Sequence, residues 1–89
     1  MKKIVQVTEV DGEGLEMLLG KKVLLFCLNY IYTGTLVGVN KTCVLLEDPA
    51  IVYETGAFDS TSFKDAQTLP NSLYVSIGAI ESFHETNKT

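Results

Sequence analysis

The sequence contains no arginine and no tryptophan, and its overall charge is negative. All its basic residues are lysines, and acidic residues outnumber them, which gives a net charge of −4. Arginine is the side chain best suited to grip phosphate with two parallel hydrogen bonds, and negative charge repels a polyanion. A strongly basic nucleic-acid-binding protein is therefore excluded, although a local lysine patch can still oppose the total charge.

Residue types that bind metals or perform catalysis are also scarce. The chain has two cysteines, Cys27 and Cys43, without Cys-x-x-Cys spacing, and its single histidine is His84. Neighbouring residues on a strand point to opposite faces, so His84 with Ser82 and Glu81 beside it is not a catalytic triad. We therefore predict no enzyme, no metal site and no cofactor.

Long hydrophobic runs are absent as well. No segment approaches the roughly 20 apolar residues that span a bilayer, and the opening residues MKKIVQVTEV alternate instead of forming the apolar centre of a signal peptide. We expect a cytoplasmic protein that does not contact membranes, with both thiols free.

What the sequence does have is a high apolar content for its length. Its 89 residues allow one domain, spanning residues 1–89, and 46% of them are apolar. A chain this short buries only about 60% of its unfolded surface, so its own core is small. We therefore expect some of the apolar surface to be covered by a further element or a second copy.

Three strands in the segment 21–48 form the centre of the expected fold. The run 23–28 is continuously apolar, 31–39 is rich in Thr and Val, and 43–47 follows the Asn40-Lys41-Thr42 turn. The turn at Asn29-Tyr30 lacks the usual Asn-Gly pair, which predicts a loop longer than two residues or a strained one. Two glycines on one face of the second strand predict a bend or a close approach of backbones.

Both faces of the first strand are apolar, so each face needs other residues to shield it from water. Val23, Leu25 and Cys27 share one face, and Leu24, Phe26 and Leu28 share the other. One face fills the core. We predict that a neighbouring copy covers the other, with the N-terminal segment of the same chain as the alternative.

The remaining segments are expected to surround this centre. Residues 1–10 form an extended N-terminal segment, and a helix over 13–19 is capped by Asp11, ended by Gly20 and plugs one end of the barrel. Pro49 either bends the third strand into AIVYE or separates a fourth strand from it. A polar variable loop covers 55–71, the last two strands are 73–77 and 79–84, and a flexible tail covers 85–89.

Short motifs in this order resemble the Sm-like (LSm, Hfq) family. The segment LLGKKVLL resembles that family's helix end and first strand, and GTLVGVN (34–40) with the Leu-Glu-Asp at 46–48 is similar to its first motif. The segment YVSIGAIESF (74–83) corresponds to the second motif. The resemblance implies an all-β fold: a small, bent, five-stranded antiparallel barrel with a short N-terminal helix.

The resemblance also implies partners and site residues. Sm-like proteins form rings, usually of six or seven subunits, in which the last strand of one subunit pairs with the neighbour. The implied oligomer interface consists of Leu24, Phe26, Leu28, Tyr74, Val75, Ile80 and Phe83. RNA bases enter pockets made by two turns, so the candidate RNA-binding residues are Asn40, Lys41, Thr42, Ser76 and Gly78.

The same two turns depart from the family pattern where bases would bind. Thr42 stands where an aromatic ring stacks on a base, and Ser76-Ile77-Gly78 replaces an Arg-Gly pair. Stacking is worth about 1–3 kcal/mol per base, and a threonine does not supply it. Two hypotheses therefore stand: a homo-oligomeric ring that binds RNA or single-stranded nucleic acid, and a structural or protein-interaction ring without the RNA pocket.

Overall fold

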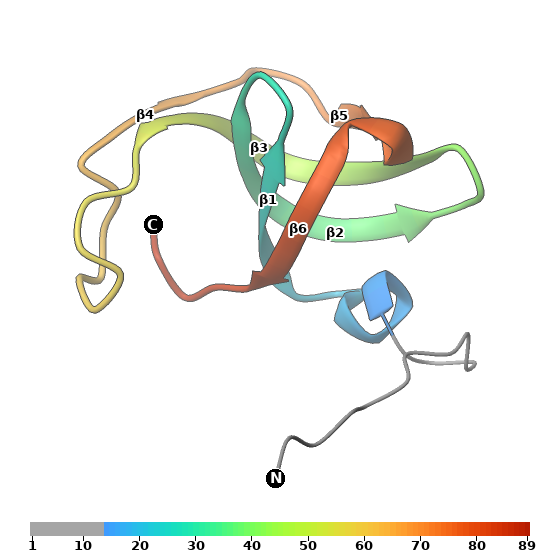
Figure 1. Ribbon diagram of the computed structural model, residues 1–89, viewed down its shortest axis with the longest axis horizontal. Helices are drawn as coiled ribbons and strands as arrows, with labels where there is room; N and C mark the ends of the chain where they lie inside the picture. The colour runs from blue at the N-terminus through green and yellow to red at the C-terminus, as the bar shows by residue number, and fades with distance from the viewer. Residues whose placement is uncertain (1–13) are drawn as a thin grey trace, which may run out of the picture.

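The computed structural model describes residues 14–89, and Figure 1 shows the arrangement of their elements. Residues 1–13, including the expected extended segment and the Asp11 cap, lie outside the described residues. The elements in chain order are η1 (Gly14–Leu18), β1 (Lys22–Cys27), β2 (Ile31–Val39), β3 (Cys43–Glu54), β4 (Asp65–Thr68), β5 (Leu73–Ser76), η2 (Ile77–Ala79) and β6 (Ile80–Glu85).

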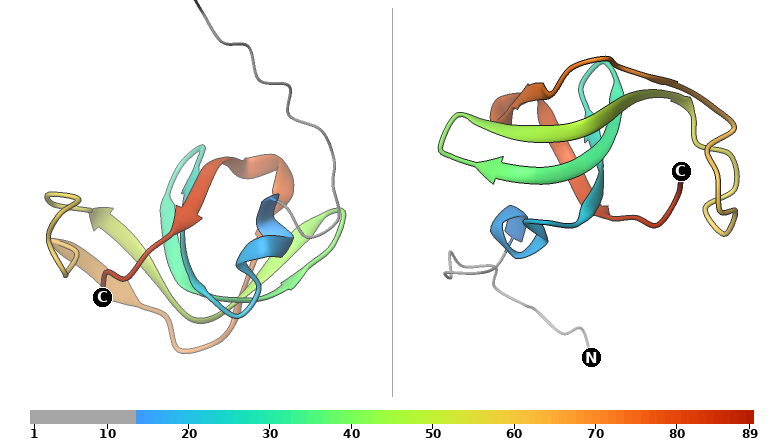
Figure 2. Two further views of the ribbon diagram at one scale, coloured as in Figure 1. Left: turned by 90° about the horizontal axis from the view of Figure 1, so that it is seen from below. Right: turned by 180° about the vertical axis from the view of Figure 1, so that it is seen from behind.

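The fold is mostly β, as the sequence predicts. Its strands pair antiparallel in the order β4-β3-β2-β1-β6, and β5 pairs with the first half of β3. The second half of β3 pairs with β4, so this one strand belongs to both ends of a strongly curved sheet (Figure 1; Figure 2). Within residues 14–89, β5 and β6 do not pair with each other, and the sheet stays open.

Six strands are present where five were predicted, because β4 lies inside the segment predicted to be a loop. Its sequence is DAQT and all four of its residues are exposed. A strand at the exposed edge of a sheet needs no buried face, so it carries no alternation of apolar and polar residues. β4 is held by its pairing with the 50–54 end of β3.

The bend in β3 settles one of the sequence alternatives: the strand runs continuously from Cys43 to Glu54, through Pro49. At the bend Asp48 has a φ of 49°, in the left-handed region. β2 passes very close at this point, since a Cβ on Gly34 would lie 3.0 Å from the Glu47 carbonyl oxygen and 3.1 Å from the Leu46 Cβ. The predicted close backbone approach is therefore found at Gly34.

The turn between β1 and β2 has three residues, 28–30, as the longer-loop alternative predicted. The Cys27 N–H donates to the Tyr30 carbonyl oxygen at 3.0 Å and closes the turn. Among residues 14–89, Asp48 is the only residue other than glycine with a positive φ, so neither Asn29 nor Tyr30 is strained.

The main core fills the concave, inner face of the sheet. Its fully buried members include Val23 and Leu25 from β1, and Leu36 from β2. The cluster is completed by Val44, Leu46 and Val75. η1 contributes Leu15 and Leu18, which are partly buried against the cluster, and the backbone leaves it at Gly20, where φ is +83°. Met17 and Leu19, which belong to the segment 13–19 expected to plug one end of the barrel, are instead 62% and 45% exposed.

The second face of β1 is buried in part by this chain itself. Leu24 is fully buried, and Ala50 and Val52 are buried at 7% and 3%, although none of the three belongs to the main core. The Phe58 ring of the 55–63 loop lies 6.5 Å from that of Phe26, which shares the face of Leu24. Leu28, at the end of this face, is 66% exposed, so the face stays open there.

The C-terminal tail, predicted to be flexible, lies against the same 55–63 loop. It runs from the end of β6 toward the 55–63 loop (Figure 1). Thr86 and Lys88 are only 8% and 5% exposed, and the Thr86 N–H donates to the Lys22 carbonyl oxygen at 2.9 Å. Thr89 is bonded to the loop in both directions, since its N–H donates to Thr61 and its carbonyl oxygen accepts from Phe63. Although the tail is polar, its backbone groups form hydrogen bonds with β1 and with the 55–63 loop.

Candidate nucleic-acid interface

The fold brings the two predicted RNA-binding turns together. The Ile77 N–H donates to the Thr42 carbonyl oxygen at 2.9 Å, and Ser76 is paired with Cys43 across the β3–β5 ladder. The five candidate residues, which are Asn40, Lys41, Thr42, Ser76 and Gly78, are all exposed. A continuous polar surface with an ammonium, an amide and two hydroxyl groups is therefore presented at one end of this ladder.

Asn40 organises the first turn through its side-chain oxygen. Oδ1 accepts from the Thr42 N–H at 2.8 Å, the Cys43 N–H at 2.9 Å and the Thr42 hydroxyl at 3.1 Å. This is the side-chain-to-backbone bonding that favours Asn in turns. The oxygen is fully used inside the turn, so what Asn40 can offer a ligand is its amide NH₂ group.

The second turn is a single turn of 3₁₀ helix, η2. Ser76 precedes it with an extended backbone, φ −65° and ψ 131°, and its hydroxyl makes no capping bond to the helix. A Cβ on Gly78 would have no neighbour closer than the Ser76 Oγ at 3.8 Å, and its φ lies outside the left-handed region. The backbone conformation at this position therefore does not require glycine, and the missing side chain leaves the surface of the turn uncovered.

A shallow pocket of about 190 Å³ lies at the other end of the β3–β5 ladder, away from these turns. Its lining includes Glu47, Asp48, Asn71 and Ser72, with Pro49, Leu69 and Pro70 completing it. Two carboxylates make it a poor receptor for a nucleic-acid backbone. The two turns, which form an open surface, carry the candidate interface.

The strands beside the turns have free outer edges. The Ile77 N–H bonds to Thr42, directly before β3, and the Thr86 N–H bonds to Lys22 in β1. Alternation along antiparallel strands therefore aims the backbones of Tyr74 and Ser76 away from β3 and those of Phe83 and Glu85 away from β1. Within the described chain, β4 and β5 each pair only with β3, and β6 pairs only with β1. The outer edges of β4, β5 and β6 are therefore unpaired within residues 14–89, and those of β5 and β6 flank the second turn.

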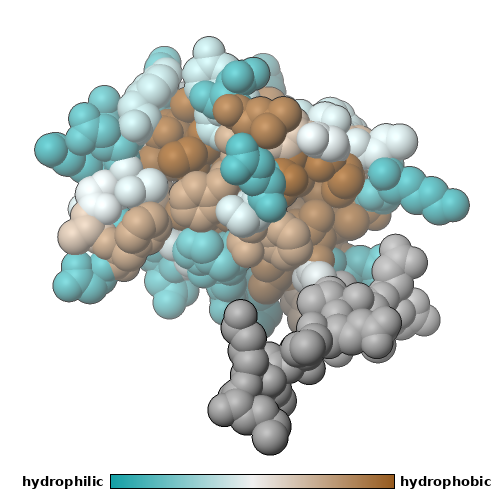
Figure 3. All heavy atoms as spheres, viewed as in Figure 1, coloured by the Kyte–Doolittle hydropathy of each residue, from teal (hydrophilic) through white to brown (hydrophobic). Residues whose placement is uncertain are grey.

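The predicted interface residues divide by exposure. Leu24 and Val75 are buried, at 0% and 5%, and have no surface to give a neighbouring copy. Tyr74 is 69% exposed, Leu28 66% and Phe83 37%, whereas Phe26 and Ile80 are partly buried. Figure 3 shows hydrophobic residues across the middle of the face that includes β6, with hydrophilic residues around its rim.

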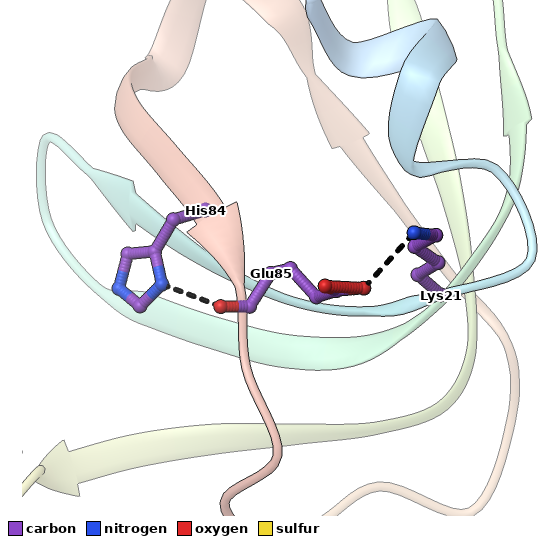
Figure 4. Close-up of polar contacts among 3 residues, drawn as sticks. All are labelled: Lys21, His84 and Glu85. Atoms are coloured by element: carbon purple, nitrogen blue, oxygen red, sulfur yellow. Dashed lines mark hydrogen bonds and ion pairs between the residues drawn. The ribbon is translucent and has the colours of Figure 1, made fainter. Parts of the chain in front are cut away.

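The end of β6 is fixed by two polar contacts of Glu85 (Figure 4). Its carboxylate pairs with the Lys21 ammonium at 3.4 Å, and its carbonyl oxygen lies 2.7 Å from the His84 Nδ1. A carbonyl oxygen only accepts, so this contact requires a proton on Nδ1. These contacts hold the last residue of the strand next to the point where the tail begins.

The two thiols are free, as predicted, and both are half-buried. Burial, and secondarily the Glu81 carboxylate, raises the pKa of Cys27. A raised pKa keeps the thiol protonated at neutral pH, which is the opposite of what a nucleophilic cysteine needs.

Sequence reasoning missed one well-built polar site, around Lys88. The tail TNKT carries no apolar residue, and its four-residue context gives no periodic signal. A buried lysine is rare unless its ammonium is satisfied, and here its partners are backbone carbonyls and aromatic rings that the sequence does not mark as a set. Only the folded chain brings them together.

Comparison with protein-family models finds no match, and no curated protein sequence matches the chain significantly. Among residues 14–89, no helix reaches the length and apolarity that a bilayer crossing requires. Over the same residues, no group of three or more His, Cys, Asp or Glu side chains is placed to hold a metal ion.

Proposed function

We propose that the protein is a subunit of an Sm-like homo-oligomeric ring, in which β5 of one copy pairs with β6 of the next. The observation that supports this most directly is that the outer edges of β5 and β6 are both unpaired within residues 14–89. Edges with free N–H and C=O groups favour pairing with another chain unless they are covered. Head-to-tail pairing of β5 with β6 covers both, and repeated around an axis it closes into a ring.

The curvature of the sheet supports the same proposal. β3 bends at Asp48 and Pro49 so that its two halves pair with different strands, and β5, η2 and β6 follow one another directly in the chain. A curved sheet ending in two short edges is what an Sm-like barrel subunit requires. Tyr74 and Phe83, exposed on the two edges, supply apolar area for the contact.

We further propose that the ring binds RNA or single-stranded nucleic acid at the turns 40–42 and 76–78. The contact between Thr42 and Ile77 supports this, since it brings the two turns into one surface on each copy. Lys41 is exposed, and one Lys41 per copy gives a ring a collar of positive charge despite the negative total. The Asn40 amide and the hydroxyls of Thr42 and Ser76 are the groups for contacting bases or sugars.

Fluorescence anisotropy with labelled oligo(U) and oligo(A) at two salt concentrations tests this binding. We expect micromolar affinity that weakens with salt, since lysine–phosphate contacts release counterions. Lys41→Ser should abolish most of it. Lys64→Ser, which removes an exposed lysine in the 55–71 segment, should leave it unchanged. The absence of salt-dependent binding at micromolar protein, or equal losses in the two variants, would remove the nucleic-acid proposal.

One observation favours a second candidate, a ring that serves as a protein-interaction module. The Asn40 side-chain oxygen is occupied by three donors within its own turn, which is the arrangement of a purely structural turn residue. Together with the net charge of −4, this suits a ring without an RNA pocket. The 260/280 nm absorbance ratio of the natively purified oligomer separates the candidates, because co-purified nucleic acid would count against this one.

A further inference from the structure

The ammonium group of Lys88 occupies a site built entirely from neutral groups of the 55–63 loop. Nζ donates to the Thr55 carbonyl oxygen at 2.8 Å and to the Ala57 carbonyl oxygen at 2.6 Å. It lies 5.3 Å from the centre of the Phe58 ring and 5.4 Å from that of Phe63. Neither of the ion pairs within residues 14–89 involves Lys88.

This combination is what a receptor for an organic ammonium ion requires. Two carbonyl oxygens satisfy two of the three N–H donors, and two aromatic faces attract the charge through their quadrupoles. Lys88 is 5% exposed, so the ammonium is taken out of water and these groups replace its hydration. A recognition site for a lysine side chain is therefore present, and it is filled.

The backbone of the tail is recognised next to the ammonium. The Thr89 N–H donates to the Thr61 carbonyl oxygen at 3.1 Å, and the Phe63 N–H donates to the Thr89 carbonyl oxygen at 3.0 Å. A residue whose N–H and carbonyl oxygen bond to two residues that lie two positions apart, as Thr89 bonds to Thr61 and Phe63, forms a parallel β-bridge. The 55–63 loop therefore binds an extended segment in two ways: it holds the lysine ammonium, and it forms backbone hydrogen bonds with the residue that follows.

The tail is joined to the rest of the molecule by a short connection. Between the last residue of β6, Glu85, and Lys88 the anchoring contacts are the Thr86 N–H to the Lys22 carbonyl oxygen and the Lys88 N–H to the Thr86 hydroxyl, at 2.9 and 3.1 Å. No apolar side chain of residues 86–89 is buried to hold the segment, because the segment has none. Its attachment depends on the lysine site and on hydrogen bonds.

We propose that Thr55, Ala57, Phe58 and Phe63 form a lysine-recognition site in which residues 86–89 are a releasable internal ligand that a second copy's tail replaces. The tail of a second copy is the occupant because it makes contacts identical to those seen within one chain, and only the connection at Glu85 differs. Exchange of an identical element between copies is a low-cost route to association. The inference does not rest on the proposed ring, since it uses neither the β5 edge nor the turns 40–42 and 76–78.

A synthetic peptide with the sequence of residues 84–89 tests the site in the full-length Lys88→Ser variant, whose own tail lacks the ammonium. We expect the peptide to bind at least about tenfold more tightly than the same peptide with norleucine at the lysine position, a factor that corresponds to about 1.4 kcal/mol. Equal affinities for the two peptides, or no binding to a folded variant, would overturn the lysine-recognition site.

Two full-length variants with complementary defects test the exchange between copies. Lys88→Ser has an intact loop without its ligand, and Phe63→Ala has an intact tail with a damaged loop. Both variants also carry Ser76→Pro, which removes an N–H from the outer edge of β5, so that the proposed ring does not bring the labels together. Mixing fluorescently labelled Lys88→Ser with Phe63→Ala in this background should give energy transfer between them, whereas mixing two samples of Lys88→Ser should give at least about tenfold weaker association. Equal signals from the two mixtures would overturn the exchange.

Hydrogen exchange of the wild-type chain tests the release of the tail without any variant, and so does not depend on whether the two variants fold. The amides of Phe63 and Thr89 should exchange through local release of the tail, faster than the β1–β2 amides and more slowly as protein concentration rises. Exchange of these two amides only at the rate of global unfolding would show that the tail is not releasable. None of these outcomes bears on nucleic-acid binding at Lys41, so failure here is distinct from failure of the proposed function.

Discussion

The two faces of β1 differ in how completely one chain buries them. On the core face Val23 and Leu25 are fully buried among regular strands. On the other face Leu24 is fully buried, Phe26 is half-buried beside the Phe58 ring of the 55–63 loop, and Leu28 is 66% exposed. An apolar second face can therefore be closed in part by an irregular segment of the same chain, without a neighbouring subunit at Leu24.

Because Leu24 and Leu25 are both buried within one chain, the support for association comes mainly from the strand edges and less from the faces of β1. A second copy has little left to cover on these faces beyond the exposed Leu28. The unpaired outer strand edges are the other features that a second copy can complete, and the proposed ring uses those of β5 and β6. An edge contact uses backbone hydrogen bonds and needs only a few exposed side chains such as Tyr74 and Phe83. The stability of the subunit and its assembly should therefore be separable by mutation.

The largest expected effect comes from the matched pair Leu25→Ala and Leu24→Ala. Removing a fully buried leucine side chain costs its transfer free energy and leaves a cavity whose cost depends on how far the surroundings relax. We expect Leu25→Ala to lower the free energy of unfolding by about 3–5 kcal/mol and Leu24→Ala by about 2–3 kcal/mol, because the loop can settle and the strands cannot. Urea denaturation of both variants checks this.

Two results of that pair would contradict the comparison. A negligible effect of Leu24→Ala would mean that the second face is not closed in solution. A larger effect of Leu24→Ala than of Leu25→Ala would mean that the loop and tail are packed more rigidly than the main core.

Gly34→Ala should give the next largest effect, through the bend that creates the two halves of β3. The added Cβ would meet the Glu47 carbonyl oxygen at 3.0 Å, and backbone yields less readily than a side chain. We expect a loss of roughly 1–3 kcal/mol, as for overpacking. Gly38→Ala on the same strand is the control, because its Cβ would lie 3.4 Å from its nearest neighbour. A thermal-unfolding comparison in which the two alanine variants behave alike would contradict the account of the bend.

Lys88→Met tests how much the lysine contributes to holding the 55–63 loop, without changing the main core. It keeps the aliphatic stem and removes the ammonium that bonds to Thr55 and Ala57, so a smaller loss, about 1–2 kcal/mol, is expected. Limited proteolysis should show faster cleavage within residues 55–63. The control is Lys64→Met, whose exposed ion pair with Glu54 should contribute less than about 0.5 kcal/mol. Indistinguishable cleavage rates would contradict a lysine anchor.

Much of the sheet can be predicted from the sequence, because local patterns specify it. The stiff β-branched residues between Ile31 and Val39 give the bounds of β2, and Pro49 marks the bend inside β3. The candidate turns 40–42 and 76–78 are adjacent, since the Ile77 N–H donates to the Thr42 carbonyl oxygen. Each of these features depends on residues that are neighbours in the sequence or in a strand ladder.

The parts that could not be predicted depend on backbone groups that sequence patterns do not display. β4 is recognised only by its pairing with β3, since the residues DAQT are all exposed. The tail around Lys88 is ordered by carbonyl oxygens more than 30 positions away in the chain. A polar segment with such partners has the same composition as one without them, so the sequence did not indicate these contacts.

The central claim is that copies associate through strand edges, with β5 of one copy paired with β6 of the next. Ser76→Pro tests it with little cost to the subunit, because φ at Ser76 is already −65°, the value that proline requires, and its N–H is aimed away from β3. Ser76→Ala is the control, since it removes the hydroxyl and keeps the N–H. Sedimentation velocity at micromolar concentration should show the wild type and Ser76→Ala as a closed oligomer and Ser76→Pro as a folded single chain. A wild type that sediments as a single chain, or a Ser76→Pro variant with the mass of the wild-type oligomer, would contradict the account.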